Sequence, residues 1–320
     1  MRHFVVVNPQ SFHKKEEYMS SVIGNISAYF ENVAKAEYTI YISRYPRDAI
    51  NAVNEYVTAT EDTVRVYSVG GDGILSDCLN GLVKLPNAEL AIIPYGTSND
   101  FVRAFGEGKN AIFRDIAKQA VAPSIPTDII SISGKYVLNF CSIGFGAAVV
   151  IKYYELCKRY PLLLKILGKS LYTAGIPFAF FDKNITLQKY EVLIDGERYD
   201  GVYMGIDLAN GSRYGGTQTP FPMAHPADGQ MEIMLHSCRA NPYFFIVAKD
   251  FIKGRYYKHP KVLHHKSAKE VVIRSNAPIY VNVDGETFCS AKIDAKIIPS
   301  AVKIVAPDRL EYVRSIKDDN

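Results

Sequence analysis

Short apolar runs alternate with amphipathic stretches along the first 130 residues or so of the chain. Four runs rich in β-branched residues predict strands at Phe4–Val7, Glu37–Ile42, Thr63–Val69 and Glu89–Ile93. Apolar residues at helical spacing between them predict helices at Glu16–Phe30, Arg47–Ala59 and Ile74–Val83. Strands that alternate with helices are typical of βαβ units, so we expect a parallel sheet.

The pattern changes after Ile130. Many short apolar or alternating runs follow, separated by Gly, Asn and Asp, such as Tyr190–Ile194 and Ile279–Val283. This texture is typical of an antiparallel sandwich. One helix, over Ala148–Leu167, is expected to interrupt it. We place the boundary between two domains near residues 128–134, in keeping with a length of 320 residues, which exceeds what one core usually organises.

Charge and cysteine usage narrow the class of protein. The 37 Lys and Arg residues against 33 Asp and Glu residues are too slight an excess for nucleic-acid binding, but suit an anionic substrate or a membrane surface. The five cysteines form no CxxC pair and predict reduced thiols. No apolar run approaches the roughly 18 residues of a spanning helix. We expect a cytoplasmic protein, peripheral at the inner membrane surface, with its oligomeric state left open, a homodimer included.

A glycine-rich loop follows the third predicted strand. Gly70-Gly71-Asp72-Gly73 is succeeded by an amphipathic helix. Successive glycines let backbone N–H groups close on phosphate oxygens, and the helix N-terminus adds its positive dipole end. Asp72 suits bound phosphate only together with a cation, and Mg²⁺ is the natural one. The alternative is an ordinary turn between a strand and a helix.

A second element repeats this pattern after the fourth predicted strand. Pro94-Tyr95-Gly96 breaks the strand, and Thr97-Ser98-Asn99-Asp100-Phe101 follows. Thr97 and Ser98 can donate to phosphate oxygens, Asn99 can fix a phosphate or a carbonyl, and Asp100 can cap a helix or meet a metal. Two such elements at the carboxyl ends of one parallel sheet favour a ligand over two empty turns.

These two motifs together closely resemble those of the diacylglycerol kinase catalytic-domain family, which includes bacterial lipid kinases and sphingosine kinases. The resemblance covers nearly the whole chain. It implies a Rossmann-like, phosphofructokinase-related α/β domain over residues 1–130, to which residues 306–320 return, and an all-β sandwich over residues 131–305. The activity implied is ATP- and Mg²⁺-dependent transfer of the γ-phosphate to the hydroxyl of diacylglycerol or a related lipid.

The resemblance also implies roles for single residues. Asn8, Ser43, the Gly70–Gly73 loop, Thr97 and Asn99 would contact the nucleotide, with Asp72 acting on its phosphates. Glu286 falls on the family's catalytic acidic residue, the general base. Asp228 would hold a structural Mg²⁺, helped by backbone carbonyls near His225 and Gln230. A basic side chain should also face the phosphates, and Lys14 or Lys15 is our choice.

Three residues depart from the family's pattern. Ile74 stands where the family has Thr, which removes a hydroxyl beside the phosphates. Phe12 replaces a Gly in the first loop, and Glu232 stands where Asp is frequent. Two alternatives to a lipid kinase stay open: an NAD kinase, since that related family shares the glycine loop, and, because of Ile74, a catalytically silent lipid- or nucleotide-binding protein.

The tripeptide Asp-Gly-Glu occurs twice, at Asp195–Glu197 and at Asp284–Glu286. Each copy lies between apolar runs, where Asp-Gly is a strong hairpin signal. From the residues alone the two are indistinguishable, and only the family position favours Glu286 over Glu197. A basic stretch with His264 and His265 adds a candidate surface for anionic headgroups, although the pattern favours an exposed basic loop.

Overall fold

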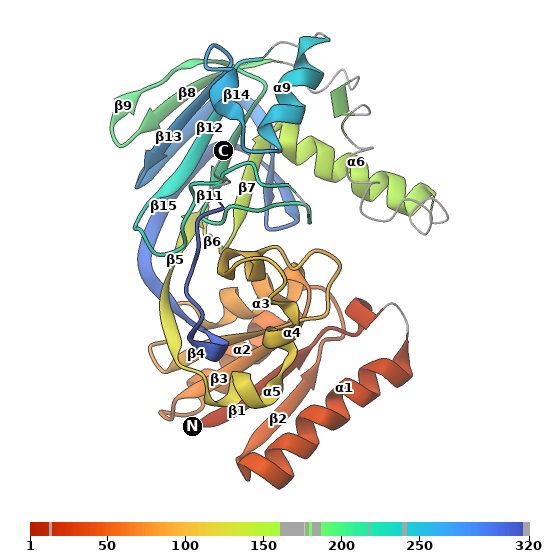
Figure 1. Ribbon diagram of the computed structural model, residues 1–320. Coiled ribbons are helices and arrows are strands. Elements are labelled where there is room, and N and C mark those ends of the chain that lie inside the picture. Colours follow the sequence, from red (N-terminus) through yellow and green to blue (C-terminus); the bar gives the residue numbers. More distant parts are fainter. Residues whose placement is uncertain are drawn as a thin grey trace, which may run out of the picture. The chain divides into compact units, whose positions relative to one another are not determined.

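The computed structural model divides into two compact units (Figure 1). The residues it describes are 1–12, 15–160, 176, 179–180, 187–216, 218–238 and 242–315. The first unit comprises Met1–Ile129 and Pro299–Val313, and the second comprises Ile130–Ile298 and Arg314–Asn320. The return to the first unit thus begins before residue 306, because strand β15 (Glu286–Val305) ends beside β4 (Ala88–Pro94) in the first unit's sheet.

The first unit contains the expected parallel sheet. Strand β1 (Arg2–Val7) pairs in parallel with β2 (Tyr38–Ile42) on one side and with β3 (Val64–Gly70) on the other, and β3 pairs in parallel with β4. The order across the sheet is β2, β1, β3, β4 and β15. Every residue of β3 is buried, as a central parallel strand covered on both faces requires. The four predicted strands are confirmed, each to within two residues at either end.

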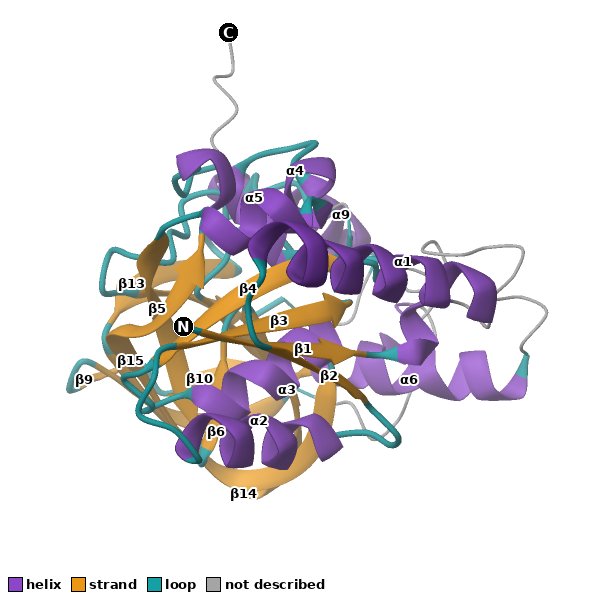
Figure 2. Cartoon of the chain, turned by 90° about the horizontal axis from the view of Figure 1, so that it is seen from below, coloured by secondary structure: helices purple, strands orange, loops and turns teal. Residues whose placement is uncertain are grey.

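Helices cover both faces of this sheet (Figure 2). Helix α1 lies with α4 and α5 on one face, and α2 packs against α3 on the other. The apolar side of α1 meets the sheet through Val22 and Ile26, which join a buried cluster with Val5 and Val69. The helices are α1 (Glu16–Ala28), α2 (Asp48–Thr58), α3 (Asp72–Leu82), α4 (Asn110–Arg114) and α5 (Ile116–Val121).

The second unit is built on antiparallel strands, as predicted. Its main sheet runs β13, β12, β11, β7, β14 and β15, and β8 pairs with the far part of β14. Side chains from these strands form one apolar core that includes Ile143, Ile206 and Val281. Strand β5 (Ser124–Ile132) is divided between the two units after Ile129. The other strands of the second unit whose bounds have not yet been given are β6 (Lys135–Val137), β7 (Phe140–Gly144), β8 (Gln188–Ile194), β9 (Glu197–Arg198), β10 (Gly201–Tyr203), β11 (Gly205–Ala209), β12 (Met231–His236), β13 (Leu263–Ala268) and β14 (Glu270–Val283).

Two helices accompany the strands of the second unit. Helix α6 (Phe145–Arg159) starts three residues before the predicted Ala148, and the part of the predicted helix beyond Tyr160 lies outside the described residues. Helix α9 (Tyr243–Phe251) was not predicted. The two meet through Phe145 and Phe244, whose ring centroids are 5.1 Å apart. In the described part of the chain, no helix has both the length and the apolar character needed to cross a membrane.

Replacing two helical glycines of the first unit by alanine is expected to change its stability in opposite directions. A Cβ on Gly81 of α3 would lie 2.6 Å from the carbonyl oxygen of Ile50 in α2, whereas a Cβ on Gly24 of α1 would meet nothing within 4 Å. Gly81→Ala should therefore destabilise the protein by about 1–3 kcal/mol through overpacking. Gly24→Ala should stabilise it by about 0.5–1 kcal/mol. Urea unfolding checks both, and shifts of the same sign would contradict the packing described.

Candidate active site

The predicted nucleotide-binding residues all follow the carboxyl ends of neighbouring parallel strands. Asn8 follows β1 and Ser43 follows β2, while Gly70 ends β3 and Thr97–Asn99 come shortly after β4. Because β1 lies between β2 and β3, the connections from β1 and β3 leave in opposite directions. Ligands bind at such a switch point in open α/β sheets.

Two glycines bring the loops after β3 and β4 into backbone contact. A Cβ on Gly96 would lie 2.2 Å from the Cα of Gly71, and a Cβ on Gly71 would lie 3.0 Å from the Cα of Gly96. The carbonyl of Gly70 accepts hydrogen bonds from the amides of Tyr95 and Gly96, at 2.8 and 2.9 Å. No residue with a side chain fits at position 96, so this contact requires the glycine there.

Polar side chains then fix the two loops to each other. Asp72, the first residue of α3, accepts a hydrogen bond from the amide of Asp100 through Oδ1, at 2.8 Å. Asn99 adopts a left-handed conformation with φ 52°, and its side chain bonds both the N–H and the C=O of Gly96. Asn99 is therefore a structural clamp as well as a predicted ligand contact. Asp72 and Asp100 place two carboxyl-bearing residues beside the glycine loop.

Two departures from the family's pattern are accommodated by burial. Ile74 is 2% exposed, and its Cγ2 would lie 2.6 Å from a Cβ on Gly70, so it supports the loop from the core side. Phe12 is 3% exposed and packs against Tyr18 and Tyr95, at ring distances of 5.8 and 5.2 Å. The first loop is a 3₁₀ turn over Pro9–Phe12. Packing of the Phe12 ring holds it in place, at a position where the family's pattern has a flexible glycine.

The other predicted contacts in this unit are positioned less directly. The Asn8 side chain accepts a hydrogen bond from the Gln10 amide at 3.0 Å. Burial raises the pKa of Asp48, but hydrogen bonds from the Arg44 amide and from the side chains of Tyr41 and Ser43 outweigh it and lower the pKa overall. The Ser43 hydroxyl is therefore shared with Asp48.

The structure describes only one of the two lysines predicted to face the phosphates. Lys14 lies outside the described residues, and Lys15 is exposed just before α1. A basic residue that sequence reasoning missed is Arg114, at the end of α4. Its Nε donates to the Pro94 carbonyl at 2.7 Å, and its guanidinium lies 4.9 Å from the Tyr95 ring. No local motif marks it, because its role depends on how α4 packs beside β4.

The structure separates the two Asp-Gly-Glu copies in the second unit. Both are hairpin turns with positive φ at Asp and Gly, 47° and 84° in the first and 44° and 96° in the second, as in type I′ turns. Glu197 is exposed and accepts a hydrogen bond from Tyr199. Glu286 is 29% exposed in its side chain and forms an ion pair with Lys135, with Oε2 and Nζ 3.0 Å apart.

Asp284 holds the turn that carries Glu286. Its two carboxylate oxygens accept hydrogen bonds from the amides of Leu138 and Phe140, at 2.9 and 3.0 Å. The hydroxyl of Tyr154 in α6 donates to the Gly285 carbonyl at 3.3 Å. The carboxylate of Glu286 is therefore presented from a turn that is fixed on both sides.

The predicted metal segment satisfies its carboxylate with protein groups. Asp228 Oδ1 accepts from the Gln230 amide at 3.1 Å, and Oδ2 lies 3.4 Å from Nη2 of Arg314. Burial raises the pKa of Asp228, and neighbouring Glu232 raises it further. The His225 carbonyl accepts from the Ala227 amide. As placed, these residues do not fit a bound Mg²⁺, and its assignment to Asp228, His225 and Gln230 stays a prediction.

The metal segment also lacks a cluster of acidic or imidazole ligands. Among the described residues, no three His, Cys, Asp or Glu side chains are grouped as a metal site. Glu232 does not turn to Asp228, because it is hydrogen-bonded to His265 and to Ser267. No step of the proposed chemistry depends on an ion in this segment.

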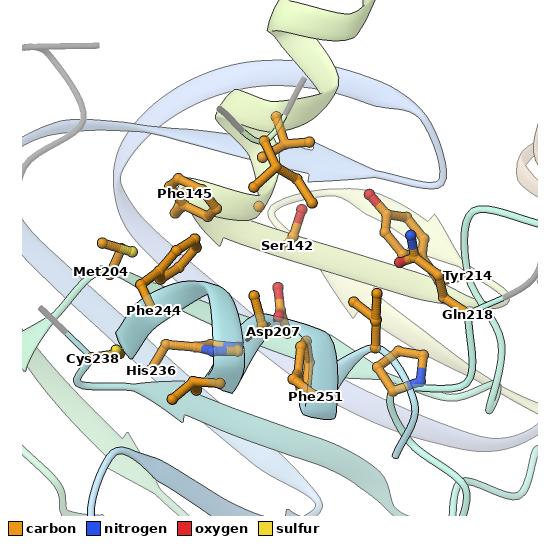
Figure 3. Close-up of a pocket in the computed structure, with 18 of the residues that line it drawn as sticks. Ser142, Phe145, Met204, Asp207, Tyr214, Gln218, His236, Cys238, Phe244 and Phe251 are labelled. Carbon is orange, nitrogen blue, oxygen red and sulfur yellow. Dashed lines mark hydrogen bonds and ion pairs between the residues drawn. The ribbon is translucent and has the colours of Figure 1, made fainter. Parts of the chain in front are cut away.

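A cavity of about 100 Å³ lies inside the second unit (Figure 3). Helix α6 and helix α9 supply most of its apolar wall, and strands β7, β11 and β12 supply polar side chains. Sequence reasoning missed it, since its lining comes from distant segments. The apolar wall includes Phe145, Val149, Met204, Phe244, Val247 and Phe251, and the polar side chains include Ser142, Asp207 and His236.

Comparison with known families decides the class. Residues 2–131 match the family model of the diacylglycerol kinase catalytic domain. Residues 179–306 match that of the YegS C-terminal NAD kinase beta sandwich-like domain. The first segment therefore carries a diacylglycerol kinase catalytic domain, and the two matched segments together span most of the chain. The protein is a kinase, and the resemblance drawn from Gly70–Gly73 and Pro94–Phe101 is confirmed.

Relatives of similar length agree with this assignment. Proteins of Staphylococcus aureus strains JH9 and Newman, provisionally named lipid kinases, are 25% identical to the chain over 299 residues, covering 90% of it and 92% of each relative. Their names describe those proteins. The coverage means that both domains of the chain, and not one alone, have counterparts in them.

Solved structures confirm the fold. A structure from Bacillus anthracis strain Sterne, provisionally assigned as a diacylglycerol kinase, has a TM-score of 0.72 at 22% identity and covers 96% of the chain and 97% of its own. Another from the same strain, described as a diacylglycerol kinase, has a TM-score of 0.68 at 20% identity and covers 97% and 98%. The predicted combination of an α/β domain and a β-sandwich domain is confirmed.

The partner of Asp228 can be tested by removing either Arg314 or a metal ion. If Arg314 is the cation at this carboxylate, Arg314→Gln should lower the melting temperature by about 2 °C or less, because the pair is partly exposed. EDTA should leave the melting temperature of the wild type unchanged in differential scanning calorimetry. A fall with EDTA that Asp228→Asn abolishes would instead support the predicted Mg²⁺.

Proposed function

We propose that the protein transfers the γ-phosphate of ATP to a hydroxyl of diacylglycerol or a related lipid, with Mg²⁺ as cofactor. The observation that carries this proposal is the joined pair of loops at Gly71 and Gly96, at the carboxyl edge of the parallel sheet. The match of residues 2–131 to the diacylglycerol kinase catalytic domain supports the reaction type. The apolar cavity of the second unit supports a lipid as acceptor.

In this proposal the first unit binds the nucleotide. The backbone amides of Gly71, Asp72 and Gly73 begin helix α3 and suit phosphate oxygens, with the helix dipole favouring their charge. Asn8, Ser43 and Thr97 follow adjacent strand ends and contact other parts of the nucleotide. Asn99 acts mainly by holding the backbone at Gly96.

The residues beside the glycine loop fit a magnesium ion. Carboxylate oxygens are the ligands Mg²⁺ prefers, and it is usually held by one or two of them together with substrate phosphates. Asp72 and Asp100, joined by a hydrogen bond, provide that donor type. Bound there, Mg²⁺ would neutralise charge on the phosphates.

Glu286 is the proposed general base. It accepts the proton of the lipid hydroxyl as the new bond to phosphorus forms. Lys135 holds its carboxylate by an ion pair, and Asp284 fixes the turn from which it projects. Positioning accounts for most of the catalysis in such reactions, so a base on a rigid turn suits this role.

Helix α9 is the proposed contact with the membrane in which the acceptor resides. Its inner side lines the cavity through Phe244, Val247 and Phe251, whereas Phe245 and Ile246 on its outer side are 43% and 56% exposed. Exposed lysines lie on α9 and the segment after it and complement anionic headgroups. They are Lys249, Lys253, Lys258 and Lys261. The nearby histidines, His259, His264 and His265, are engaged with protein partners.

Two other functions can be distinguished from the proposed one in a single assay. The second domain's likeness to an NAD kinase sandwich makes NAD a competing acceptor. A silent nucleotide-binding protein is the other, because Ile74 gives no hydroxyl to the loop. Incubation with labelled ATP, Mg²⁺ and a panel of lipids plus NAD distinguishes the three. Transfer to NAD alone, or ATP binding without any transfer, would overturn the proposal.

The twin turns provide a matched test of the general base. Glu286→Gln should reduce the rate of lipid phosphorylation by about 100-fold or more, since it removes the proton acceptor, with ATP affinity unchanged. Glu197→Gln makes the same change in the same type of turn and should retain full activity. Initial rates with radiolabelled ATP decide, and equal rates for both variants would show that Glu286 is not the base.

The membrane contact predicts a selective loss of vesicle binding. Sedimentation with vesicles containing anionic phospholipid should bring down the wild type, and the double variant Phe245→Ser, Ile246→Ser should bind at least about fivefold more weakly because it loses apolar insertion. Val202→Ser, at an apolar position that is 51% exposed on β10, serves as control. Equal binding by all three proteins would exclude α9 as the contact.

A further inference from the structure

The cavity of the second unit has in its lining a buried hydroxyl that no group in the described part of the chain satisfies. Ser142 on β7 is 1% exposed and lines the cavity. Its Oγ has no hydrogen-bond partner among the described residues. Buried hydroxyls nearly always have a partner, so an unpaired one on a residue that lines a cavity is a candidate contact for a ligand atom.

A carboxylate lies next to this hydroxyl. Asp207 on β11 is paired in register with Ser142, and its side chain is 9% exposed. One of its oxygens, Oδ2, is 2.8 Å from Nε2 of His236, which also lines the cavity. Figure 3 shows Ser142 and Asp207 side by side, with His236 beside Asp207.

Helix α6 approaches this pair so closely that only glycine fits at position 146. A Cβ on Gly146 would lie 2.8 Å from the Cβ of Ser142 and 3.2 Å from both Oγ of Ser142 and Oδ1 of Asp207. The first turn of α6 therefore packs directly over the polar pair, and Gly146, Ser142 and Asp207 line the cavity together. The surrounding wall is aromatic and aliphatic, from Phe145, Phe244 and the other wall residues.

The chemistry of the pair selects for a hydrogen-bond donor. A carboxylate only accepts hydrogen bonds, while a hydroxyl both donates and accepts. A ligand hydroxyl or amino group can donate to Asp207 and accept from or donate to Ser142. Ester carbonyl and ether oxygens can only accept, and they would leave the carboxylate facing another electronegative atom.

We propose that Ser142 and Asp207 are specificity-determining residues that recognise a hydroxyl or amino group of the lipid acceptor, in addition to the hydroxyl that receives the phosphate. This inference rests on the proposed function and narrows it. The favoured acceptor is a lipid whose polar part carries a second donor beside its apolar chain, such as a monoacyl or monoalkyl polyol or an amino alcohol. Diacylglycerol, whose other oxygens are in esters, lacks that donor.

Two soluble lipids that differ by one hydroxyl test the proposal. 1-O-Octylglycerol has a hydroxyl at carbon 2 that its 2-deoxy analogue lacks, and the 2-amino analogue separates recognition of a hydroxyl from that of an amine. Isothermal titration calorimetry without nucleotide should give about tenfold tighter binding of octylglycerol or of the amino compound than of the deoxy analogue. Ser142→Ala and Asp207→Asn should each reduce that preference to about twofold or less.

A control variant and a second readout make the result specific. Ser68→Ala removes an equally buried hydroxyl from β3 of the first unit and should keep the tenfold preference. Circular dichroism and melting temperatures verify that each variant is folded. Equal binding of the three lipids by the wild type, as expected if the space holds only water, would overturn the proposal even if a variant failed to fold.

Phosphate transfer, measured separately, distinguishes this inference from the function on which it rests. Transfer to lipids with equal binding of the three probes would support a lipid kinase and reject the roles of Ser142 and Asp207. A Ser142-dependent preference without transfer to any lipid would reject the kinase reaction and keep the binding site. A variant that lowers kcat while the binding preference stays at tenfold would also reject the specificity role.

Discussion

The backbone contact between Gly71 and Gly96 is the constraint on which the first unit's site depends. Two parallel strands, β3 and β4, end at this contact, and the Gly70 carbonyl accepts two amides from the opposite loop. Because the contact leaves no space for a Cβ, the loops stay close enough for Asp72 to accept the Asp100 amide. The N-terminus of α3 and the loop after β4 are thereby fixed together before any ligand binds, which is the preorganisation that charge stabilisation requires.

A second constraint is the sharing of strands between the units. Strand β15 pairs with β14 over its first part and with β4 near its end, so residues of one strand belong to both units. Strand β5 likewise has residues on both sides of the division after Ile129. Neither unit is therefore one continuous stretch of sequence. A truncation at residue 130 would leave the parallel sheet without the end of β15, so the two domains are not separable by cutting the chain once.

The features that could be predicted from sequence alone are those determined by residues close together in the chain. Apolar periodicity predicted β1–β4 and α1–α3 of the first unit but not the short helices α4 and α5, and the glycine loop was visible as a motif. It did not predict the start of the return at Pro299, because nothing in the alternation of β15 marks where its partner changes. Nor could it separate Glu286 from Glu197, since the turn chemistry is the same and only the long-range neighbour Lys135 differs.

Polar residues occupy two positions in the cavity where apolar side chains would be expected to give a more stable core. Positions 142 and 207 face the same space from paired strands, and apolar side chains there would extend the wall made by Phe145 and Val149. An unsatisfied buried hydroxyl costs about 1–3 kcal/mol, and a buried carboxylate needs a partner merely to be tolerated. His236 provides that partner for Asp207, whereas nothing described does so for Ser142. The proposed ligand contact would satisfy Ser142, which the fold leaves without a partner among the described residues.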